Sequence, residues 1–220
     1  MLSNSDSHSA NPWRLGREAN VFDLEKMTYW EIIDAIRKKD KSKFLFTIET
    51  SPEYGKYHLD GHRNCGISLE PEETRKVNGN CPKCRRKLTI GVLHRVEELA
   101  DRPIGFVPKD AIPFKTLLPL YEIISFATGV DKLYSKKVLE EQNKLIRKFG
   151  NEFNVLLNAS KEDLMKVVDE RIADGVMRVR DSKVNYIAGY DGVYGRPLFN
   201  NLKVPKRSLG QKSLSDFKGL

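Results

Sequence analysis

The sequence predicts a mixed α/β (α+β) fold made of several small parts. Three observations lead to this prediction. A short run of aromatic and β-branched residues, Phe44–Glu49, indicates a strand. Apolar stripes with helical spacing lie before and after this strand in the sequence. All three cysteines fall between the strand and the helical stripes that follow it. With 220 residues, the chain is long enough for one large domain or two to three small ones.

Composition and charge exclude some classes of protein and favour others. The chain is 40% hydrophobic and 31% charged, which is ordinary for a globular protein. It contains no apolar run of the roughly 20 residues that span a bilayer, and its first twenty residues lack the apolar stretch of a signal peptide. Thirty-eight basic against 30 acidic side chains give a net charge of +8, which favours nucleic acid as partner. We therefore expect a cytoplasmic protein in a reducing compartment, with no membrane association.

The first half is expected to begin with a helix over residues 23–43. Thr28 and Glu31 have the spacing of a capping box, and an apolar stripe follows at Tyr29, Ile32, Ile33 and Ile36. Residues 44–49 follow as a strand, residues 88–92 form a second candidate strand, and residues 96–100 are expected to be helical.

The second half is expected to be mostly helical. One helix starts near residue 116 and ends at Gly129, a charged helix spans residues 136–149 and ends at Gly150, and a third spans residues 161–173 and ends at Gly175. Short strands are expected at 176–179 and 184–188. From residue 200 the chain is rich in Lys, Ser and Gly and is expected to be a mobile tail.

The strongest local signal is a pair of metal-binding knuckles. His62 and Cys65 form one, Cys81 and Cys84 form the other, and two residues separate the ligands in each. This spacing predicts a closed tetrahedral Cys3His site for structural zinc, with His58 as a rival to His62. Gly66 follows the first knuckle, whereas Arg85 stands at the equivalent position of the second. Basic residues around the second knuckle suit phosphate contact, although a solvated rim explains them equally well; they are Lys83, Arg85, Arg86 and Lys87.

A second signal lies near the N-terminus. Asp6 and His8 stand two positions apart, so on a strand they project to one side, as ligands of a catalytic metal do. Arg14 and Arg17 follow shortly and are candidates for contact with phosphate.

These motifs together resemble a known family. Ser5-Asp6-Ser7-His8-Ser9 with Arg14–Glu18 is similar to the last metal-binding motif of the polymerase-and-histidinol-phosphatase (PHP) barrel. With the run from Tyr57 to Gly66, the Cys-Pro-Lys-Cys motif and the stretch Leu88–Pro103, the chain resembles endonuclease Q, a repair enzyme that cuts DNA on the 5′ side of deaminated bases. Relatives often carry the label of UvrD-like helicases, but the phosphate-binding G-x-x-x-x-G-K-[ST] motif of an ATPase does not occur here.

The chain departs from that family before Asp6. The resemblance implies an H-x-H motif, further histidines and a carboxylate in the N-terminal part of the barrel, and none precedes Asp6. We therefore expect the C-terminal part of such an enzyme, in which Asp6 and His8 contribute to an incomplete site for Mg, Mn or Zn. A separate chain carrying the missing half of the barrel would complete the site. Two alternatives are a non-catalytic zinc module that binds DNA and a clamp, and a degenerate remnant with an unpaired strand edge.

The resemblance also implies that a deaminated base is extruded from the duplex. Candidates to line its route are His94, Arg95, Tyr190, Asp191 and Tyr194. Alternatively, His94 and Arg95 form a helix-entry network with Glu97 and Glu98, and the Tyr-Asp-Gly-Val-Tyr-Gly stretch is a turn between strands.

The tail carries a candidate sliding-clamp peptide. Gln211, Leu214 and Phe217 fit the pattern Q-x-x-L-x-x-F, and Lys218 stands where a second aromatic is usual. The expected organisation is a barrel remnant at 1–43, a zinc-binding domain at 44–110, a helical DNA-binding domain at 111–200 and a flexible tail at 201–220.

Overall fold

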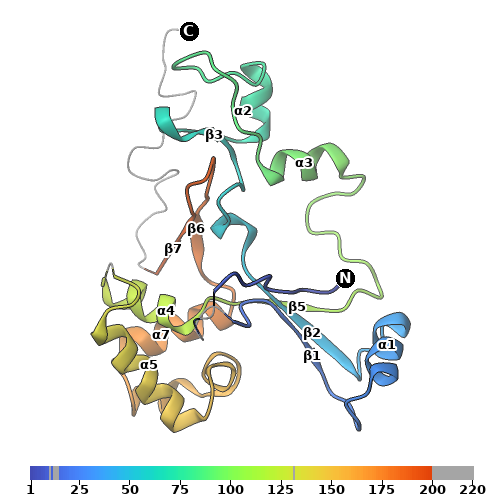
Figure 1. Ribbon diagram of the computed structural model, residues 1–220, viewed down its shortest axis with the longest axis vertical. Coiled ribbons are helices and arrows are strands. Elements are labelled where there is room, and N and C mark those ends of the chain that lie inside the picture. The colour runs from blue at the N-terminus through green and yellow to red at the C-terminus, as the bar shows by residue number, and fades with distance from the viewer. Residues whose placement is uncertain (10, 12–14, 131, 200–220) are drawn as a thin grey trace. The chain divides into compact units, whose positions relative to one another are not determined.

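The computed structural model describes residues 1–9, 11, 15–130 and 132–199. They form two compact units, each built from two separate stretches of chain (Figure 1). Unit 1 consists of Met1–Thr50 and Val107–Lys183, and unit 2 consists of Ser51–Phe106 and the described residues from Val184 onward. The predicted mixed α/β fold is confirmed.

A three-stranded sheet joins the two stretches of unit 1. β1 (Ala19–Phe22) runs antiparallel to β2 (Phe44–Glu49), and β5 (Phe114–Thr116) runs parallel to β2 along its other edge. Phe44 and Ile48 are each only 1% exposed, which explains why this aromatic and β-branched run forms the central strand. The expected domain boundary between residues 43 and 44 thus separates two strands of one sheet, and the units interleave along the chain.

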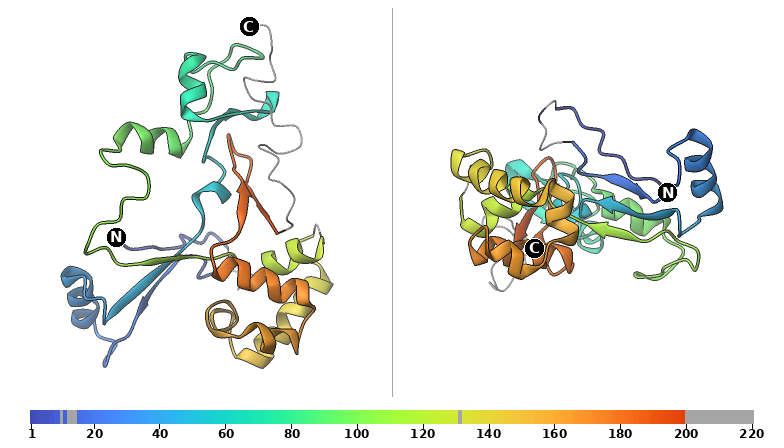
Figure 2. Two further views of the ribbon diagram at one scale, coloured as in Figure 1. Left: turned by 180° about the vertical axis from the view of Figure 1, so that it is seen from behind. Right: turned by 90° about the horizontal axis from the view of Figure 1, so that it is seen from below.

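Helices make up the rest of unit 1. They are α1 (Tyr29–Lys38), α4 (Leu120–Thr128), α5 (Lys136–Phe149), a π-helical turn (Asn154–Asn158), α6 (Lys161–Met165) and α7 (Glu170–Arg180). Figures 1 and 2 show α4, α5 and α7 packed together, with α1 at the far end of the strands. The core lies around α4, where Leu120, Tyr121, Ile123 and Ile124 are at most 1% exposed.

Local capping signals set several helix ends where the sequence predicts them. α5 has the predicted bounds: the Ser135 hydroxyl accepts the N–H of Val138 at its start, and Gly150 follows its last residue with a φ of 86°. α1 is shorter than predicted because the Thr28 hydroxyl caps it by accepting the N–H of Glu31, and Lys39 ends it with a left-handed φ of 50°.

Two C-terminal predictions are wrong. The expected helix over 161–173 is broken into α6 and α7, because the Asp169 side chain accepts the N–H of Arg171 and starts a new helix. α7 then continues through Gly175 to Arg180, so the strand expected at 176–179 is helical. Val176 and Val179 are buried on the helix face that also carries Ile172, and this burial overrides their β propensity.

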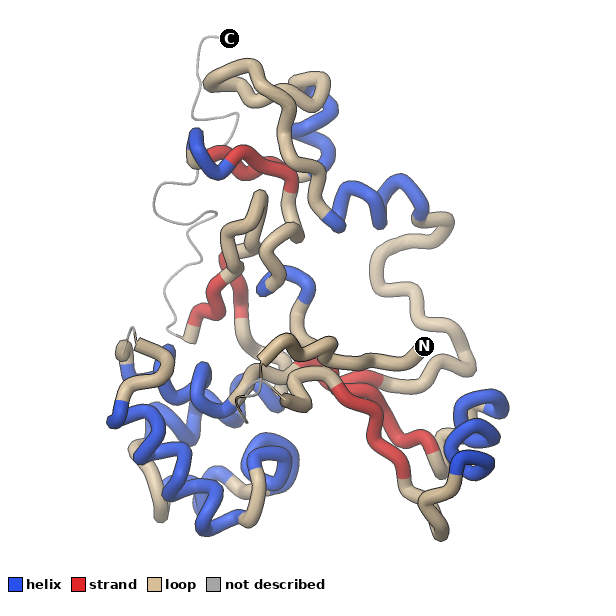
Figure 3. Tube along the Cα trace, viewed as in Figure 1, coloured by secondary structure: helices blue, strands red, loops and turns tan. Residues whose placement is uncertain are grey.

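Unit 2 contains short elements connected by loops (Figure 3). They are a 3-10 turn (Pro52–Tyr54), β3 (Asp60–His62), a second 3-10 turn (Arg63–Cys65), β4 (Ile67–Leu69), α2 (Pro71–Lys76), α3 (Val92–Leu99), β6 (Asn185–Ile187) and β7 (Arg196–Leu198). β3 pairs with β4 and β6 with β7, both antiparallel. A small core of buried residues includes two residues of β4; its members are Ile67, Leu69, Cys81 and Leu88.

The strand expected at 88–92 is reduced to a single bridge between Thr89 and Gly61. The N–H of Gly91 donates to the carboxylate of Asp60 at 2.6 Å, and α3 begins directly afterwards at Val92. The helix expected from residue 116 likewise begins later, at Leu120, because β5 extends to Thr116 and Pro119 caps α4. Among the residues that the structure describes, no helix combines the length and apolar character needed to cross a membrane.

Candidate functional site

Four predicted ligands meet in unit 2. The ligand atoms of His62, Cys65, Cys81 and Cys84 all lie within 4.8 Å of one another, and the Sγ of Cys84 is 3.3 Å from the Nδ1 of His62. Three thiols and one imidazole match the donor set of structural zinc sites. Within the described ranges, this is the cluster of three or more such side chains that can hold a metal ion, and His58 is not part of it.

The two knuckles have the same backbone conformation after their second ligand. Gly66 has a φ of 66° and Arg85 a φ of 63°, so both occupy the left-handed region. That conformation turns the chain back sharply, and a hydrogen bond from the N–H of Arg85 to the carbonyl of Cys81, at 2.8 Å, closes the second knuckle. The second knuckle therefore has the same shape without a glycine. Its conformation is less favourable by about 1–2 kcal/mol, which is the cost of a side chain in the left-handed region.

The thiols differ in their affinity for protons. Burial, together with hydrogen bonds to the thiols of Cys84 and Cys81, raises the pKa of the Cys65 thiol to about 11. A hydrogen bond with the backbone of Arg86 instead lowers the pKa of Cys84. A bound dication favours the thiolate at every ligand position, so metal binding would release protons from this cluster.

His58 lies outside the cluster in a partly buried position. Burial lowers the pKa of its imidazole, and its Nδ1 is buried without a hydrogen-bond partner among the residues described. A neutral ring is consistent with this environment. The structure therefore places His62, rather than its rival, among the cysteines.

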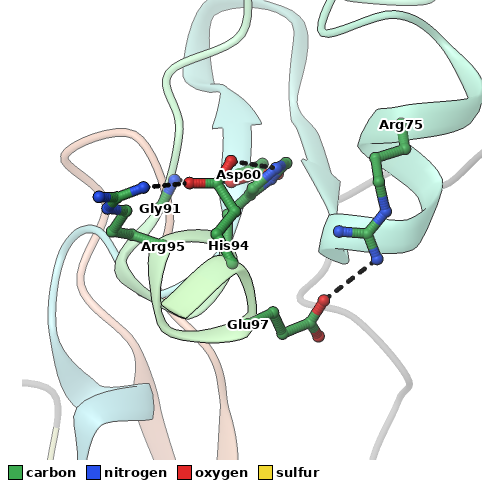
Figure 4. Close-up of polar contacts among 7 residues, drawn as sticks. Asp60, Arg75, Gly91, His94, Arg95 and Glu97 are labelled. Carbon is green, nitrogen blue, oxygen red and sulfur yellow. Dashed lines mark hydrogen bonds and ion pairs between the residues drawn. The ribbon is translucent and has the colours of Figure 1, made fainter. Parts of the chain in front are cut away.

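A second polar site connects β3 with α3. Asp60 is fully buried, and its carboxylate accepts the N–H of Gly91 at 2.6 Å and lies 2.5 Å from the Nδ1 of His94 (Figure 4). The other ring nitrogen of His94 lies 3.7 Å from Glu98. Asp60 is two residues before the ligand His62, so one short strand carries both the buried carboxylate and a metal ligand. The sequence did not indicate a role for Asp60, because a single carboxylate in a short strand forms no recognisable motif.

The other basic candidates of unit 2 lie at the surface. Arg95 pairs with Glu98 at 2.7 Å, which is one contact of the helix-entry network considered as an alternative. A second ion pair joins Arg75 to Glu97 at 3.1 Å (Figure 4). Exposed basic side chains also surround the second knuckle: Lys83, Arg85, Arg86 and Lys87. These groups are accessible to phosphate, and none of them is buried among apolar residues.

Asp191, a candidate for contact with the base, lies in a tight turn held by hydrogen bonds. Asp191 and Gly192 both have positive φ, of 40° and 83°, and hydrogen bonds join Tyr190 and Val193, so these four residues form a turn of the I′ pattern. The Asp191 carboxylate accepts from the Thr89 hydroxyl at 2.6 Å and from the N–H of Arg63 at 2.7 Å. This is the turn expected as the alternative.

Of the two rings, only one is available for stacking on a base. Tyr190 is 6% exposed, and its ring packs so closely on Gly61 that a Cβ there would lie 2.4 Å from its Cδ2. Tyr194 is 55% exposed, with the Nζ of Lys56 located 4.8 Å from the ring centroid. A buried ring cannot stack on an extruded base, so only Tyr194 retains the geometry of a contact residue.

In unit 1, the structure does not bring the N-terminal candidates into a metal site. Asp6 and His8 are exposed, lie in no strand, and are joined by a contact of 2.8 Å from the Nδ1 of His8 to the backbone carbonyl of Asp6. Asp6 also has a φ of 40°, which removes the strand geometry that the prediction assumed. Arg14 lies outside the described residues, as do Gln211, Leu214 and Phe217 of the clamp peptide.

Arg17 has a partner that the sequence did not indicate. Its guanidinium lies 3.3 Å from the carboxylate of Glu122, a side chain only 1% exposed, and the Tyr121 hydroxyl donates to the same carboxylate at 2.8 Å. Arg17 also lines a cavity of about 230 Å³ together with Glu152. Burial and the charge of Glu122 raise the pKa of Glu152. A glutamate within the apolar stripe around residues 117–124 was the available signal for this network.

The chain is similar to proteins of known sequence over most of its length. A family model described as the MJ0043 C-terminal domain matches residues 119–183. The uncharacterized protein MJ0043 of Methanocaldococcus jannaschii is 37% identical over 205 residues, which are 92% of this chain and 26% of that protein. The uncharacterized protein YqxK of Bacillus subtilis is 32% identical over 195 residues, 89% of this chain and 46% of that protein. The chain thus spans less than half the length of these relatives.

Two solved structures share its fold. The lesion-specific endonuclease PfuEndoQ of Pyrococcus furiosus is 33% identical with a TM-score of 0.82, covering 100% of this chain and 52% of that one. An endonuclease Q bound to a 27-mer duplex with an abasic lesion at its active site gives a TM-score of 0.78 at 33% identity, covering 98% of this chain and 52% of that one. The resemblance to endonuclease Q drawn from the sequence motifs is thereby confirmed, for a chain about half as long as these structures.

Proposed function

We propose, from a likeness to endonuclease Q that extends over its whole length, that this chain is the DNA-handling part of a repair endonuclease that recognises deaminated bases. The observation that carries the proposal is the TM-score of 0.82 at 33% identity to a lesion-specific endonuclease. A net charge of +8 supports an electrostatic contribution to binding DNA. In the proposed enzyme, the phosphodiester on the 5′ side of the deaminated base is hydrolysed.

Catalysis would require residues beyond those in this chain. Asp6 and His8 supply two candidate ligands, and a catalytic divalent metal, whether Mg, Mn or Zn, needs more. We propose that a barrel half carried by another polypeptide stretch completes the site. The relatives support this, because the chain covers only 26% to 52% of their lengths.

The Cys3His cluster is proposed as a structural zinc site. Its four side chains would occupy all four positions of a tetrahedral zinc ion and leave none for substrate. The metal would therefore stabilise the fold of unit 2. The two knuckles with matching left-handed residues support this role. Metal content measured by plasma mass spectrometry should give one zinc per chain, and Cys81→Ala with Cys84→Ala should remove it.

A specific observation favours a second candidate function. Among the described residues, the cluster that can hold a metal consists of four ligand side chains, and the exposed Asp6 and His8 are not members of it. A non-catalytic zinc module that binds DNA would have these features. It would bind lesion DNA with an affinity that falls steeply with salt, and it would cut none under any metal.

A nicking assay distinguishes the two candidates. Duplex DNA carrying one deoxyuridine or deoxyinosine is incubated with Mg, Mn or Zn, with this chain alone and with the N-terminal half of a related barrel added. Cleavage that requires both components supports the enzyme, and its loss in Asp6→Asn with His8→Gln supports their role. Lesion binding without cleavage in any tube supports the recognition module instead.

A sliding clamp is proposed as a further partner of the tail. Gln211, Leu214 and Phe217 have the spacing with which an apolar pair fills a pocket and a glutamine bonds at its edge. Phe217→Ala should abolish co-elution with the clamp, whereas Lys218→Ala should not.

A further inference from the structure

The helix α3 of unit 2 exposes an apolar face. Val92, Val96 and Leu99 recur at i, i+4 and i+7, which places them on one side of the helix. Their exposed fractions are 56%, 54% and 66%. In a surface helix of a soluble domain, such a face normally packs against the core. These three residues are called the α3 stripe below.

Polar contacts hold the other side of α3 to unit 2. His94 contacts the buried carboxylate of Asp60 at 2.5 Å, and Glu97 pairs with Arg75 of α2 at 3.1 Å (Figure 4). The helix packs against β3 and α2, the two elements that carry these partners. α3 is therefore fixed in place while its apolar stripe remains exposed.

The residues that flank α3 in the sequence add to this apolar character. Ile90 precedes the helix and Ile104 and Phe106 follow it, and all three side chains are exposed. Single exposed apolar residues are common on protein surfaces, but gathered ones mark interaction sites. The stripe and its flanks therefore indicate an interface.

The charges around the stripe favour a protein partner over nucleic acid. Three ion pairs join the charged groups on and beside α3: Arg75 with Glu97, Arg95 with Glu98, and Arg102 with Asp101. Binding to DNA depends on basic groups that neutralise phosphates, and each guanidinium here already has a carboxylate partner. The complementary surface for this stripe is an apolar one on a protein.

The length of α3 favours insertion into a groove over pairing with a second copy of the chain. The helix has eight residues, about two turns. Helices that pair in a coiled coil sustain their apolar pattern over about three to four heptads. A short helix with apolar anchors at i, i+4 and i+7 instead fits a hydrophobic groove.

The similar solved structures contain enough additional polypeptide to supply that groove. This chain aligns over its full length with the lesion-specific endonuclease PfuEndoQ, yet it covers only 52% of that protein. The remainder, nearly half of PfuEndoQ, has no counterpart in this chain. A partner of that size can cover the stripe.

We propose that the α3 stripe docks into an apolar groove on the barrel half that completes the enzyme. The inference rests on the proposed function, in which another polypeptide stretch carries that half. Burial of Val92, Val96 and Leu99 removes apolar surface from water, which is the dominant favourable contribution to most protein association. Docking attaches unit 2, with its metal cluster, to the half that carries the other catalytic ligands.

The test uses a fusion in which the N-terminal half of an endonuclease Q precedes this full chain, so that both parts fold in one polypeptide. A protease then cuts the linker between them. Analytical ultracentrifugation over a dilution series gives the mass of the complex and its dissociation constant. The stripe variant is Val96→Gln with Leu99→Gln, because glutamine favours the helix and removes apolar surface. Val193→Gln, at a valine of unit 2 that is 40% exposed and lies outside α3, is the matched control.

The cut wild-type fusion should sediment as one half bound to one chain, and the control should behave in the same way. The stripe variant should raise the dissociation constant by about tenfold or more. Its urea midpoint, measured on this chain alone, should not change, because the substituted side chains are already exposed. A lowered midpoint would show that the stripe packs within the chain itself, and this would overturn the proposal.

The other contrary results are also distinct. A stripe variant that associates as tightly as the wild type, or wild-type parts that separate, overturns the docking surface. A dimer of this chain alone that the stripe substitutions dissociate overturns it in favour of a second copy. Nicking of a deoxyuridine duplex by the uncut fusion tests the proposed function separately. If the uncut fusion fails to nick while its cut parts stay associated through the stripe, the proposed enzyme falls and the docking surface stands.

Discussion

Asp60 holds β3 to α3 through two hydrogen bonds, and its removal should destabilise unit 2 strongly. The carboxylate is fully buried and accepts from the N–H of Gly91 at 2.6 Å and contacts the Nδ1 of His94 at 2.5 Å. Hydrogen bonds to a charged group contribute about 1.5–3 kcal/mol each. Asp60→Ala should therefore lower the free energy of unfolding by about 3–5 kcal/mol, the range for breaking a buried pair.

The assay is urea unfolding followed by circular dichroism, with hydrogen exchange at the Gly91 amide to localise the effect. Asp60→Asn keeps an acceptor for Gly91 and should cost less, about 1–2 kcal/mol. Glu72→Gln is the surface control in the same unit, because its pair with Lys76 is mostly exposed and contributes little to stability. If Asp60→Ala costs less than about 1 kcal/mol, the buried carboxylate does not hold these elements together and the reasoning fails.

Three further predictions concern the metal cluster and the buried carboxyl of unit 1. Chelation should loosen the backbone around the knuckles and speed tryptic cleavage within residues 83–87 while the helices of unit 1 persist in circular dichroism, since the buried core around the cluster is small and includes the ligand Cys81 itself; unchanged digestion would count against a structural metal. Gly66→Ala should cost about 1–2 kcal/mol in urea unfolding because its φ is 66°, whereas Arg85→Gly, at a φ of 63°, should be neutral or stabilising by up to about 1 kcal/mol; equal effects of the two changes would contradict the shared conformation. The raised pKa of Glu152 means that the folded state binds its proton more tightly than the unfolded state, so stability should fall as pH rises from about 4.3 through the raised pKa. Glu152→Gln should lack this contribution in pH-dependent thermal melts, and an identical pH profile would refute it.

Much of the metal cluster and several helix ends could be predicted from the sequence, because they depend on residues close together in the chain. The two-residue spacing within each knuckle allows few other geometries, and all four predicted ligands meet. Ser135 and Gly150 bound α5 where local capping rules place them. Thr28 starts α1 for the same reason.

Other predictions failed where packing between distant segments outweighs local preference. Val176 and Val179 favour a strand by propensity, yet burial beside Ile172 makes them helical. The expected boundary after residue 43 falls between β1 and β2, two strands of one sheet, and β2 also pairs with β5, which follows Phe106 in the sequence. No local sequence pattern indicates which strand, about 70 residues away, will pair with β2.

The sequence by itself determined the mixed α/β composition, the ligand set of the cluster and the resemblance to endonuclease Q, since each depends on residue types at short spacing. Only the tertiary structure decided which polar groups become buried together. Asp60 with His94, and Arg17 with Glu122, are brought together across 34 and 105 residues. The cavity beside Glu152 also depends on that folding, because its lining comes from four separate segments of unit 1.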